Sequence, residues 1–149
     1  MSEEGGKKAL IILFNGTVDA LQMMASLAYG LTAMGIHVYI FLQTWGVWAF
    51  LKGNPEKLNH LDPNARWSET YKDLVPEIIE NMKKAGTANW YELLQEMKED
   101  GMLTVYSCST AALQFGVKSK DGFDEIVDDI TGVFEAAQLA EECDIFYYV

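Results

Sequence analysis

The chain has 149 residues, half of them hydrophobic, and it carries 22 acidic against 11 basic side chains. This length suits one domain with a real core, and we expect residues 9–149 to form it behind a short disordered leader, residues 1–8. The acidic excess and a single arginine, Arg66, argue against a nucleic-acid partner, because phosphate backbones require basic patches. We find no pattern of a secretory signal or a membrane span, and we therefore expect a cytoplasmic protein with free thiols.

The first part of the chain predicts a strand, a helix and a second strand. Residues 9–14 are continuously apolar, as in a strand buried on both faces of a parallel sheet. Thr17 is a candidate helix cap, after which apolar residues recur at helical spacing until Gly35. The second strand, residues 36–42, should run parallel to the first because a helix connects them. His37 lies near the start of this strand and is interpreted as structural.

Aromatic residues mark the segment that follows. Within residues 43–51, Trp45 and Trp48 share one helical face, either as an aromatic wall beside a reactive centre or as core or subunit packing. Residues 53–73 form a polar excursion with glycine and proline punctuation that also contains Trp67. This excursion is interpreted as a lid, an interface arm or a long loop.

Two further helices and a third strand come next. Residues 74–84 and 89–100 have apolar residues at helical spacing, which predicts helices that face the core. Asn89 and Glu92 have the spacing of a capping box at the start of the second helix. Residues 102–106 are mostly apolar and predict the third strand.

The last part of the chain repeats this alternation. We expect a short helix over residues 110–115, a short strand within residues 125–130, a helix over residues 131–142 and a final strand over residues 144–149. Five strands alternating with helices indicate a three-layer α/β/α sandwich with a five-stranded, mainly parallel sheet. Acidic residues gather in this region, either as a solvated face or as a docking surface for a basic partner: Asp124, Glu125, Asp128, Asp129, Glu141, Glu142 and Asp144.

Cys108 is the only strong nucleophile at the edge of the sheet where ligands usually bind. In parallel sheets that edge lies beyond the carboxyl ends of the strands, and Cys108 lies where the third strand gives way to a helix. The start of this helix, with Ser109 or Thr110, would stabilise a thiolate. The neighbouring turns supply further candidate binding or anion-stabilising residues: Asn15, Gly16, Thr17, Thr44 and Trp45.

Several enzyme classes lack residues that they need. A cysteine phosphatase would have an arginine where this chain has Gln114, and a cysteine protease needs a histidine base, for which neither His37 nor His60 is convincingly placed. Scattered single histidines predict no metal site, and we expect no cofactor. Cys143 is interpreted as a buried small hydrophobe. It should lie roughly 17 Å, a strand length, from Cys108 and so form no disulfide with it.

The chain resembles the small soluble DsrE/DsrF-like proteins related to sulfur relay and sulfur oxidation, from about residue 8 to residue 149. The resemblance depends on four features: Gly16-Thr17-Val18-Asp19, Met34-Gly35 with residues 41–46, the turn at Cys108, and a glycine-led helix before a hydrophobic final strand. It implies a five-stranded α/β/α domain that forms homotrimers or homohexamers. It also implies a persulfide on Cys108 and a TusA-like or rhodanese-like sulfur donor or acceptor protein.

Three functions are consistent with the sequence. The first is a sulfur carrier, sulfurtransferase-like rather than a self-sufficient enzyme, that passes sulfur between partner proteins from Cys108. The second is a non-catalytic assembly or regulatory subunit, in which aromatic surfaces and the acidic face bind partners and Cys108 is an ordinary buried cysteine. The third is a small-ligand-binding domain that uses Asn15, Thr17 and Thr44.

Overall fold

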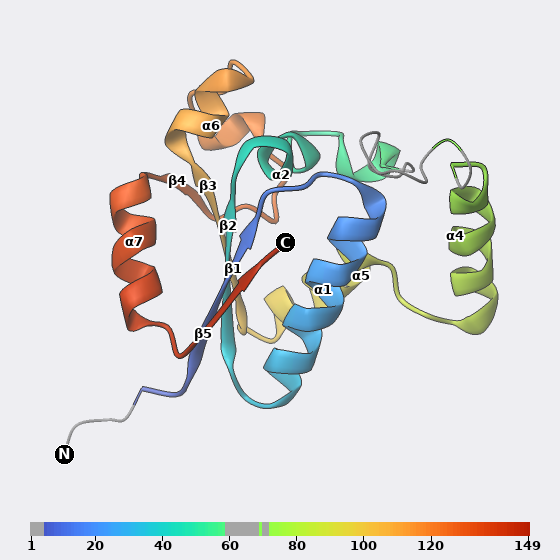
Figure 1. Cartoon of the computed structure of the whole chain (residues 1–149), viewed down its shortest axis with the longest axis horizontal. Coiled ribbons are helices and arrows are strands. Elements are labelled where there is room, and N and C mark those ends of the chain that lie inside the picture. The colour runs from blue at the N-terminus through green and yellow to red at the C-terminus, as the bar shows by residue number, and fades with distance from the viewer. Residues whose placement is uncertain (1–4, 59–68, 70–71) are drawn as a thin grey trace.

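A five-stranded parallel sheet forms the centre of the protein (Figure 1). The structure is a computed structural model and describes residues 5–58, 69 and 72–149. The sheet has the strand order β4-β3-β2-β1-β5. Its strands are, in chain order, β1 (Lys8–Leu13), β2 (His37–Leu42), β3 (Leu103–Cys108), β4 (Asp129–Thr131) and β5 (Ile145–Tyr148).

Helices cover both faces of this sheet and complete the three layers. On one face lie α1 (Val18–Ala33) and α5 (Trp90–Glu99), and on the other lies α7 (Val133–Glu142) (Figure 1). The short helices α2 (Thr44–Ala49) and α6 (Ser109–Gln114) stand at one end of the sheet. The predicted fold class, an α/β/α sandwich with a parallel sheet, is confirmed. Among the described residues, no helix has the length and apolar character needed to cross a membrane.

Strand register divides the side chains between the two faces. Successive residues of a strand point to opposite sides, so the residues at alternate positions of paired strands share a face. The face toward α1 and α5 carries side chains that are wholly inaccessible to solvent: Ala9, Ile11, Leu13, Val38, Ile40, Leu42 and Val105. The face toward α7, called the α7 face below, carries mostly larger side chains: Leu10, Ile12, Tyr39, Phe41, Tyr106, Phe146 and Tyr148.

Helix ends follow the sequence signals at Asn89 and Gly35, and in position alone at Thr17. Asn89 accepts a hydrogen bond from the Glu92 N–H at 2.9 Å and the Glu92 carboxylate accepts one from the Asn89 N–H at 3.2 Å, so the predicted capping box is confirmed. Helix α1 ends just before Gly35, whose φ is 78°. Thr17 is the N-cap residue of α1, as predicted, but its hydroxyl makes no cap bond. The hydroxyl is buried and has no hydrogen-bond partner among the described residues, and only 7% of the residue is exposed.

Two strand boundaries differ from the prediction for reasons seen in the hydrogen bonds. Lys8, expected in the leader, is the first residue of β1, and its N–H donates to the Asp144 carboxylate at 2.9 Å. The fourth strand begins only at Asp129. Just before it, the Asp124 carboxylate accepts the Ile126 N–H, and the Asp128 carboxylate accepts the Val105 N–H of β3. Such bonds from side chains compete with the backbone bonds of a sheet.

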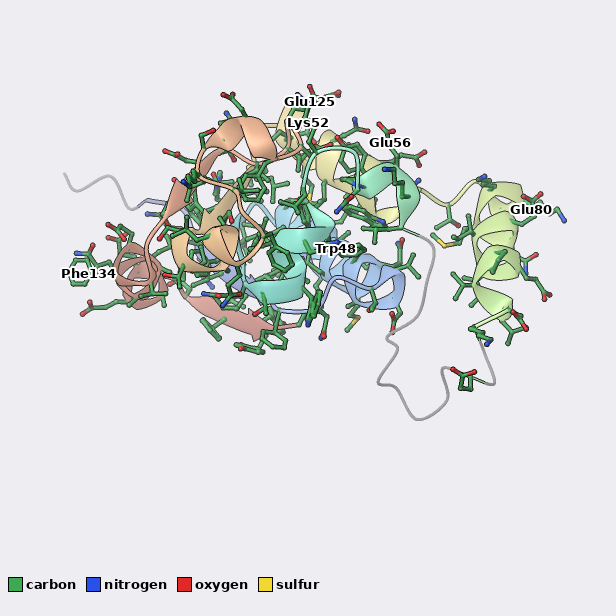
Figure 2. The ribbon with its side chains drawn as sticks, turned by 90° about the horizontal axis from the view of Figure 1, so that it is seen from above. Trp48, Lys52, Glu56, Glu80, Glu125 and Phe134 are labelled. Carbon is green, nitrogen blue, oxygen red and sulfur yellow. The ribbon has the colours of Figure 1, made fainter. Side chains whose placement is uncertain are left out.

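Helix α4 (Leu74–Ala85) does not pack against the core as predicted. It lies apart from the sheet on the far side of α1, and Figure 2 shows it, marked by Glu80, at one end of the molecule. Ile78 is exposed, whereas Val75 is buried. The apolar side of α4 lines a cleft of about 880 Å³ together with residues of α1 and α5. The apolar spacing predicted the helix correctly but not the surface that it faces.

The polar excursion between α2 and α4 falls largely outside the described residues. Its first part includes a short 3-10 helix, η1 (Pro55–Lys57). Trp67 and His60 lie among the residues that the structure does not describe. The interpretations of this segment as a lid, an arm or a loop therefore stay predictions.

Candidate functional site at the carboxyl edge of the sheet

The register of the central strands brings three turns together at the carboxyl edge of the sheet. Leu13 of β1 pairs with Leu42 of β2, and Leu42 pairs with Ser107 of β3. The chain leaves all three strands at this level. Cys108 extends β3 by one residue and pairs with Thr131 of β4. The structure therefore places Cys108 on the same edge as the turns that contain the other candidate residues.

Cys108 is the last residue of β3 and the N-cap residue of α6. Its thiol is free, but only 2% of the residue is exposed, so it is closed off from solvent in this conformation. The hydroxyl of Ser107, which is wholly buried, donates to the Cys108 carbonyl oxygen at 3.4 Å. Ser109 is half-buried and Thr110 exposed in the first turn of α6. A reagent must displace part of this edge to reach the sulfur.

The turns after β1 and β2 interlock beside this cysteine through two glycines. The Gly46 N–H donates to the Phe14 carbonyl oxygen at 3.1 Å. A Cβ atom on Gly46 would overlap the Leu13 carbonyl oxygen, and one on Gly16 would overlap the Trp45 carbonyl oxygen. Gly16 therefore serves the close approach of two backbones. Gly46, which belongs to the motif of residues 41–46, serves the same purpose against Leu13.

Thr44 has a strained backbone at this edge. Its φ is 43°, a left-handed value that a β-branched residue rarely adopts. Such strain persists only where surrounding structure imposes it, and it is often found at functional sites. The candidates for a small-ligand site, Asn15, Thr17 and Thr44, do not line the cleft beside α4.

Trp45 connects the two short helices that stand at this edge. Its ring contacts the Phe115 ring edge-on, with the ring centres 5.9 Å apart, and so joins α2 to the end of α6. Trp45 is exposed on its other side, whereas Trp48 is half-buried and packs against the core. Trp45 therefore contacts the segment that follows Cys108.

A hollow on the α7 face lies next to the buried thiol. Cys108 alternates with Tyr106 along β3, so both lie on the α7 face. A hollow of about 390 Å³ is lined by Tyr106, by Thr131, which pairs with Cys108, and by acidic residues of β4 and α7. Burial is the main cause that raises the pKa of the Tyr106 hydroxyl. The hollow thus reaches the neighbours of Cys108 without including it.

His37 and Cys143 lie at the opposite, amino-terminal edge of the sheet. His37 is the first residue of β2, and its Nε2 lies 2.8 Å from the Thr104 hydroxyl. Burial, then the charges of Lys8 and Lys98, lowers the His37 pKa. Cys143 ends α7 just before β5 and is half-buried rather than buried as expected. Burial raises its pKa. Within the described residues, no group of three or more His, Cys, Asp or Glu side chains could hold a metal ion.

The acidic residues near β4 are partly structural. The Tyr91 hydroxyl donates to the Asp124 carboxylate, and the Lys98 ammonium donates to the Asp128 carboxylate and, at 3.2 Å, to the Ile126 carbonyl oxygen. These contacts fasten α5 to the segment that leads into β4. The acidic cluster is therefore not simply a solvated face.

The fold and this edge define a class: small parallel α/β/α domains with a cysteine where a central strand meets a helix. The chain belongs to the DsrE/DsrF-like family, whose model matches residues 7–147. A similar solved structure is that of a protein of unknown function, MTH1491, from Methanobacterium thermoautotrophicum. It is 11% identical, with a TM-score of 0.56, and the match covers 97% of this chain and 100% of that one. At this identity the likeness shows the fold alone. No curated protein matches the chain.

Proposed function

We propose that the protein is a sulfur carrier that holds a persulfide on Cys108 and passes the sulfur between partner proteins. The observation that carries this proposal is the place of Cys108, a free thiol at the carboxyl edge of a parallel sheet. Membership of the DsrE/DsrF-like family supports it, since the family suggests a role related to sulfur relay. Among the described residues, the histidine His37 and the second cysteine Cys143 lie at the other edge of the sheet, away from Cys108. The lack of a base or a second thiol beside Cys108 in this part of the chain favours a carrier over a self-sufficient enzyme.

The transfer step needs no oxidant. The Cys108 thiolate attacks the outer sulfur of a donor persulfide, R–S–SH. A bond forms between the Cys108 Sγ and that sulfur as the S–S bond of the donor breaks, the proton stays on the transferred sulfur, and the donor leaves as R–S⁻. In this proposal, backbone N–H groups at the start of α6, with Ser109 or Thr110, stabilise the charged sulfur. The reverse sequence delivers the sulfur to an acceptor thiolate.

The burial of Cys108 adds a requirement to this proposal. Since only 2% of the residue is exposed, sulfur transfer needs a displacement of α6 or α2 that opens the edge. We propose that a TusA-like or rhodanese-like partner protein, as donor or acceptor, docks at this edge and favours the open form. The carrier would act as a homotrimer or homohexamer in a reducing compartment such as the cytoplasm, where its thiols stay free.

Mass spectrometry of the intact protein tests the proposal. Reduced protein is incubated with a persulfide donor, and the expected product is one sulfur atom heavier. The adduct should be lost in Cys108→Ser and kept in Cys143→Ser, which is a matched control because it removes the other free thiol. An adduct that persists in Cys108→Ser, or that never forms on the wild type, would contradict the proposal.

A second function is favoured by the same burial. In a non-catalytic assembly or regulatory subunit, Cys108 would be an ordinary core cysteine. This fits its place among the buried residues of the hydrophobic core. The rate of alkylation under native conditions separates the two functions. A carrier should show alkylation of Cys108 that speeds up when a sulfur-donor protein is added, whereas a core cysteine should stay equally slow.

A further inference from the structure

Within the part of the chain that the structure describes, α7 covers the α7 face of the sheet, and a second hollow lies on the β5 side of that helix. This hollow has a volume of about 350 Å³. Its lining includes exposed or half-buried apolar side chains from β1, β5 and α7, which we call the β5 patch: Ile12, Phe14, Ala137, Ala140, Phe146 and Tyr148. Phe146 and Tyr148 are 54% and 67% exposed, values typical of side chains that lack a packing partner.

Charge distinguishes the two sides of α7. The hollow on the β4 side is lined by Asp129, Glu135 and Glu142, whereas none of the described residues that line the hollow on the β5 side is charged. The whole chain has a net charge of −11, so two copies repel each other over most of their surfaces. Contact between two copies through the β5 patch would place no like charges of the patch against each other.

The β5 strand is also an edge that lacks the usual protection. It pairs with β1 on one side, and its other side has no strand partner among the described residues. Its sequence from Ile145 to Tyr148 contains no charged residue and no proline, two of the features by which natural edge strands avoid pairing. The opposite edge, β4, has three residues and starts with the exposed Asp129. An uncharged edge next to an uncharged patch favours strand pairing there.

We propose that β5 pairs antiparallel with β5 of a second copy of this chain, so that the two sheets become one. A two-fold axis between the strands brings Phe146 and Tyr148 of both copies together on the α7 face, where aromatic cross-strand pairs stabilise a sheet. Asp144, which precedes each strand, lies at opposite ends of the pair. The two Asp144 side chains are then roughly 15 Å apart. This separation exceeds the Debye length at physiological salt, so their repulsion is largely screened.

This pairing makes a choice between the assemblies that the proposed function allows. A two-fold contact places the same patch on both sides of the interface. A closed trimer contains no contact of this kind, whereas a hexamer with two-fold axes does. The inference does not depend on Cys108, because the β5 patch contains no thiol. Failure of the pairing would leave the persulfide test unaffected, and the reverse also holds.

Sedimentation of two matched double variants tests the pairing. Phe146→Lys with Tyr148→Lys adds charges to the patch, and Leu113→Lys with Met34→Lys makes the same change at exposed apolar residues on α6 and at the end of α1. We expect wild type and the Leu113/Met34 variant to associate in even numbers. The Phe146/Tyr148 variant should associate at least roughly thirtyfold more weakly. A monomeric or purely trimeric wild type, or equal weakening by both variants, would overturn the proposal.

Hydrogen exchange of the unmodified protein gives a test that does not depend on folding of a variant. Upon dilution below the dissociation constant, amides of β5 should exchange faster, because their second neighbour strand is lost, while amides of β4 should not change. Exchange in β5 that is independent of protein concentration, in a protein that dissociates over the same range, would contradict the pairing.

Discussion

The Tyr91 hydroxyl donates a hydrogen bond of 2.7 Å to the Asp124 carboxylate, and this contact joins α5 to the segment before β4. The same carboxylate accepts the Ile126 N–H at 3.0 Å. Burial, followed by this hydrogen bond, raises the pKa of Tyr91, so the hydroxyl remains a donor at physiological pH. The position of β4, which pairs with the strand of Cys108, therefore depends on contacts made away from the site.

Removing this hydroxyl should destabilise the fold. Tyr91→Phe leaves the Asp124 carboxylate without its side-chain donor, and we expect a loss of about 1 kcal/mol in the free energy of unfolding, measured by urea denaturation. Tyr29→Phe is the matched control, because the Tyr29 hydroxyl donates to the exposed Glu96. It should change stability little. Equal losses in the two variants would show that the contact with Asp124 has no special weight.

The carboxylate of Asp128 should contribute similarly. It accepts the Lys98 ammonium and, at 2.8 Å, the Val105 N–H, so Asp128→Ala removes partners from both. We expect a loss of about 1 to 2 kcal/mol in urea denaturation. Glu80→Ala serves as control, since Glu80 contacts Lys84 at 4.0 Å on the exposed side of a helix. A loss no greater than that of Glu80→Ala would contradict this expectation.

His37 should make stability depend on pH. Its folded-state pKa is lowered by burial, so the unfolded chain takes up the proton at a higher pH than the folded chain does. This contribution to stability is fully present above the unfolded pKa and is lost as the pH falls through the folded one. In His37→Gln, the free energy of unfolding should therefore decline less between about pH 7 and about pH 5. Identical declines in variant and wild type would contradict the assignment.

Two glycine substitutions should have opposite effects. Gly46→Ala places a Cβ against the Leu13 carbonyl oxygen where two backbones meet, and we expect a loss of at least about 2 kcal/mol. Gly30→Ala lies within α1, where a Cβ meets no atom of the described residues within 4 Å, and it should stabilise the protein by about 0.5 to 1 kcal/mol. Thermal unfolding of both variants measures these effects. A stable Gly46→Ala protein would show that the two turns can separate.

Loss of the Trp45 ring should expose Cys108 more often. Trp45→Ala removes the ring contact between α2 and Phe115, and we expect alkylation of Cys108 to become about threefold to tenfold faster. Peptide mass spectrometry after timed labelling measures this rate. Phe134→Ala, which removes an exposed aromatic ring at the start of α7, should leave it unchanged. An unchanged rate in Trp45→Ala would mean that the edge opens by another route.

Much of the fold could be predicted because its signals are local. The apolar runs of β1 and β2, the end of α1 at Gly35 and the capping box of α5 each depend on residues close together in the chain. The start of β4 could not be predicted in this way. It depends on Asp128, whose carboxylate binds the Val105 N–H, a residue 23 positions away.

The candidate site shows the same division. Alternation of strands and helices placed Cys108 at the carboxyl edge, because parallel strands joined by helices must all end on one side. The burial of its thiol, the interlocking of Gly16 and Gly46 and the strain at Thr44 arise where separate turns meet. Amphipathic spacing likewise predicted α4 but not its position, since the spacing describes one surface and packing requires two. Contacts between distant segments are formed by the folded chain as a whole, and no local pattern records them.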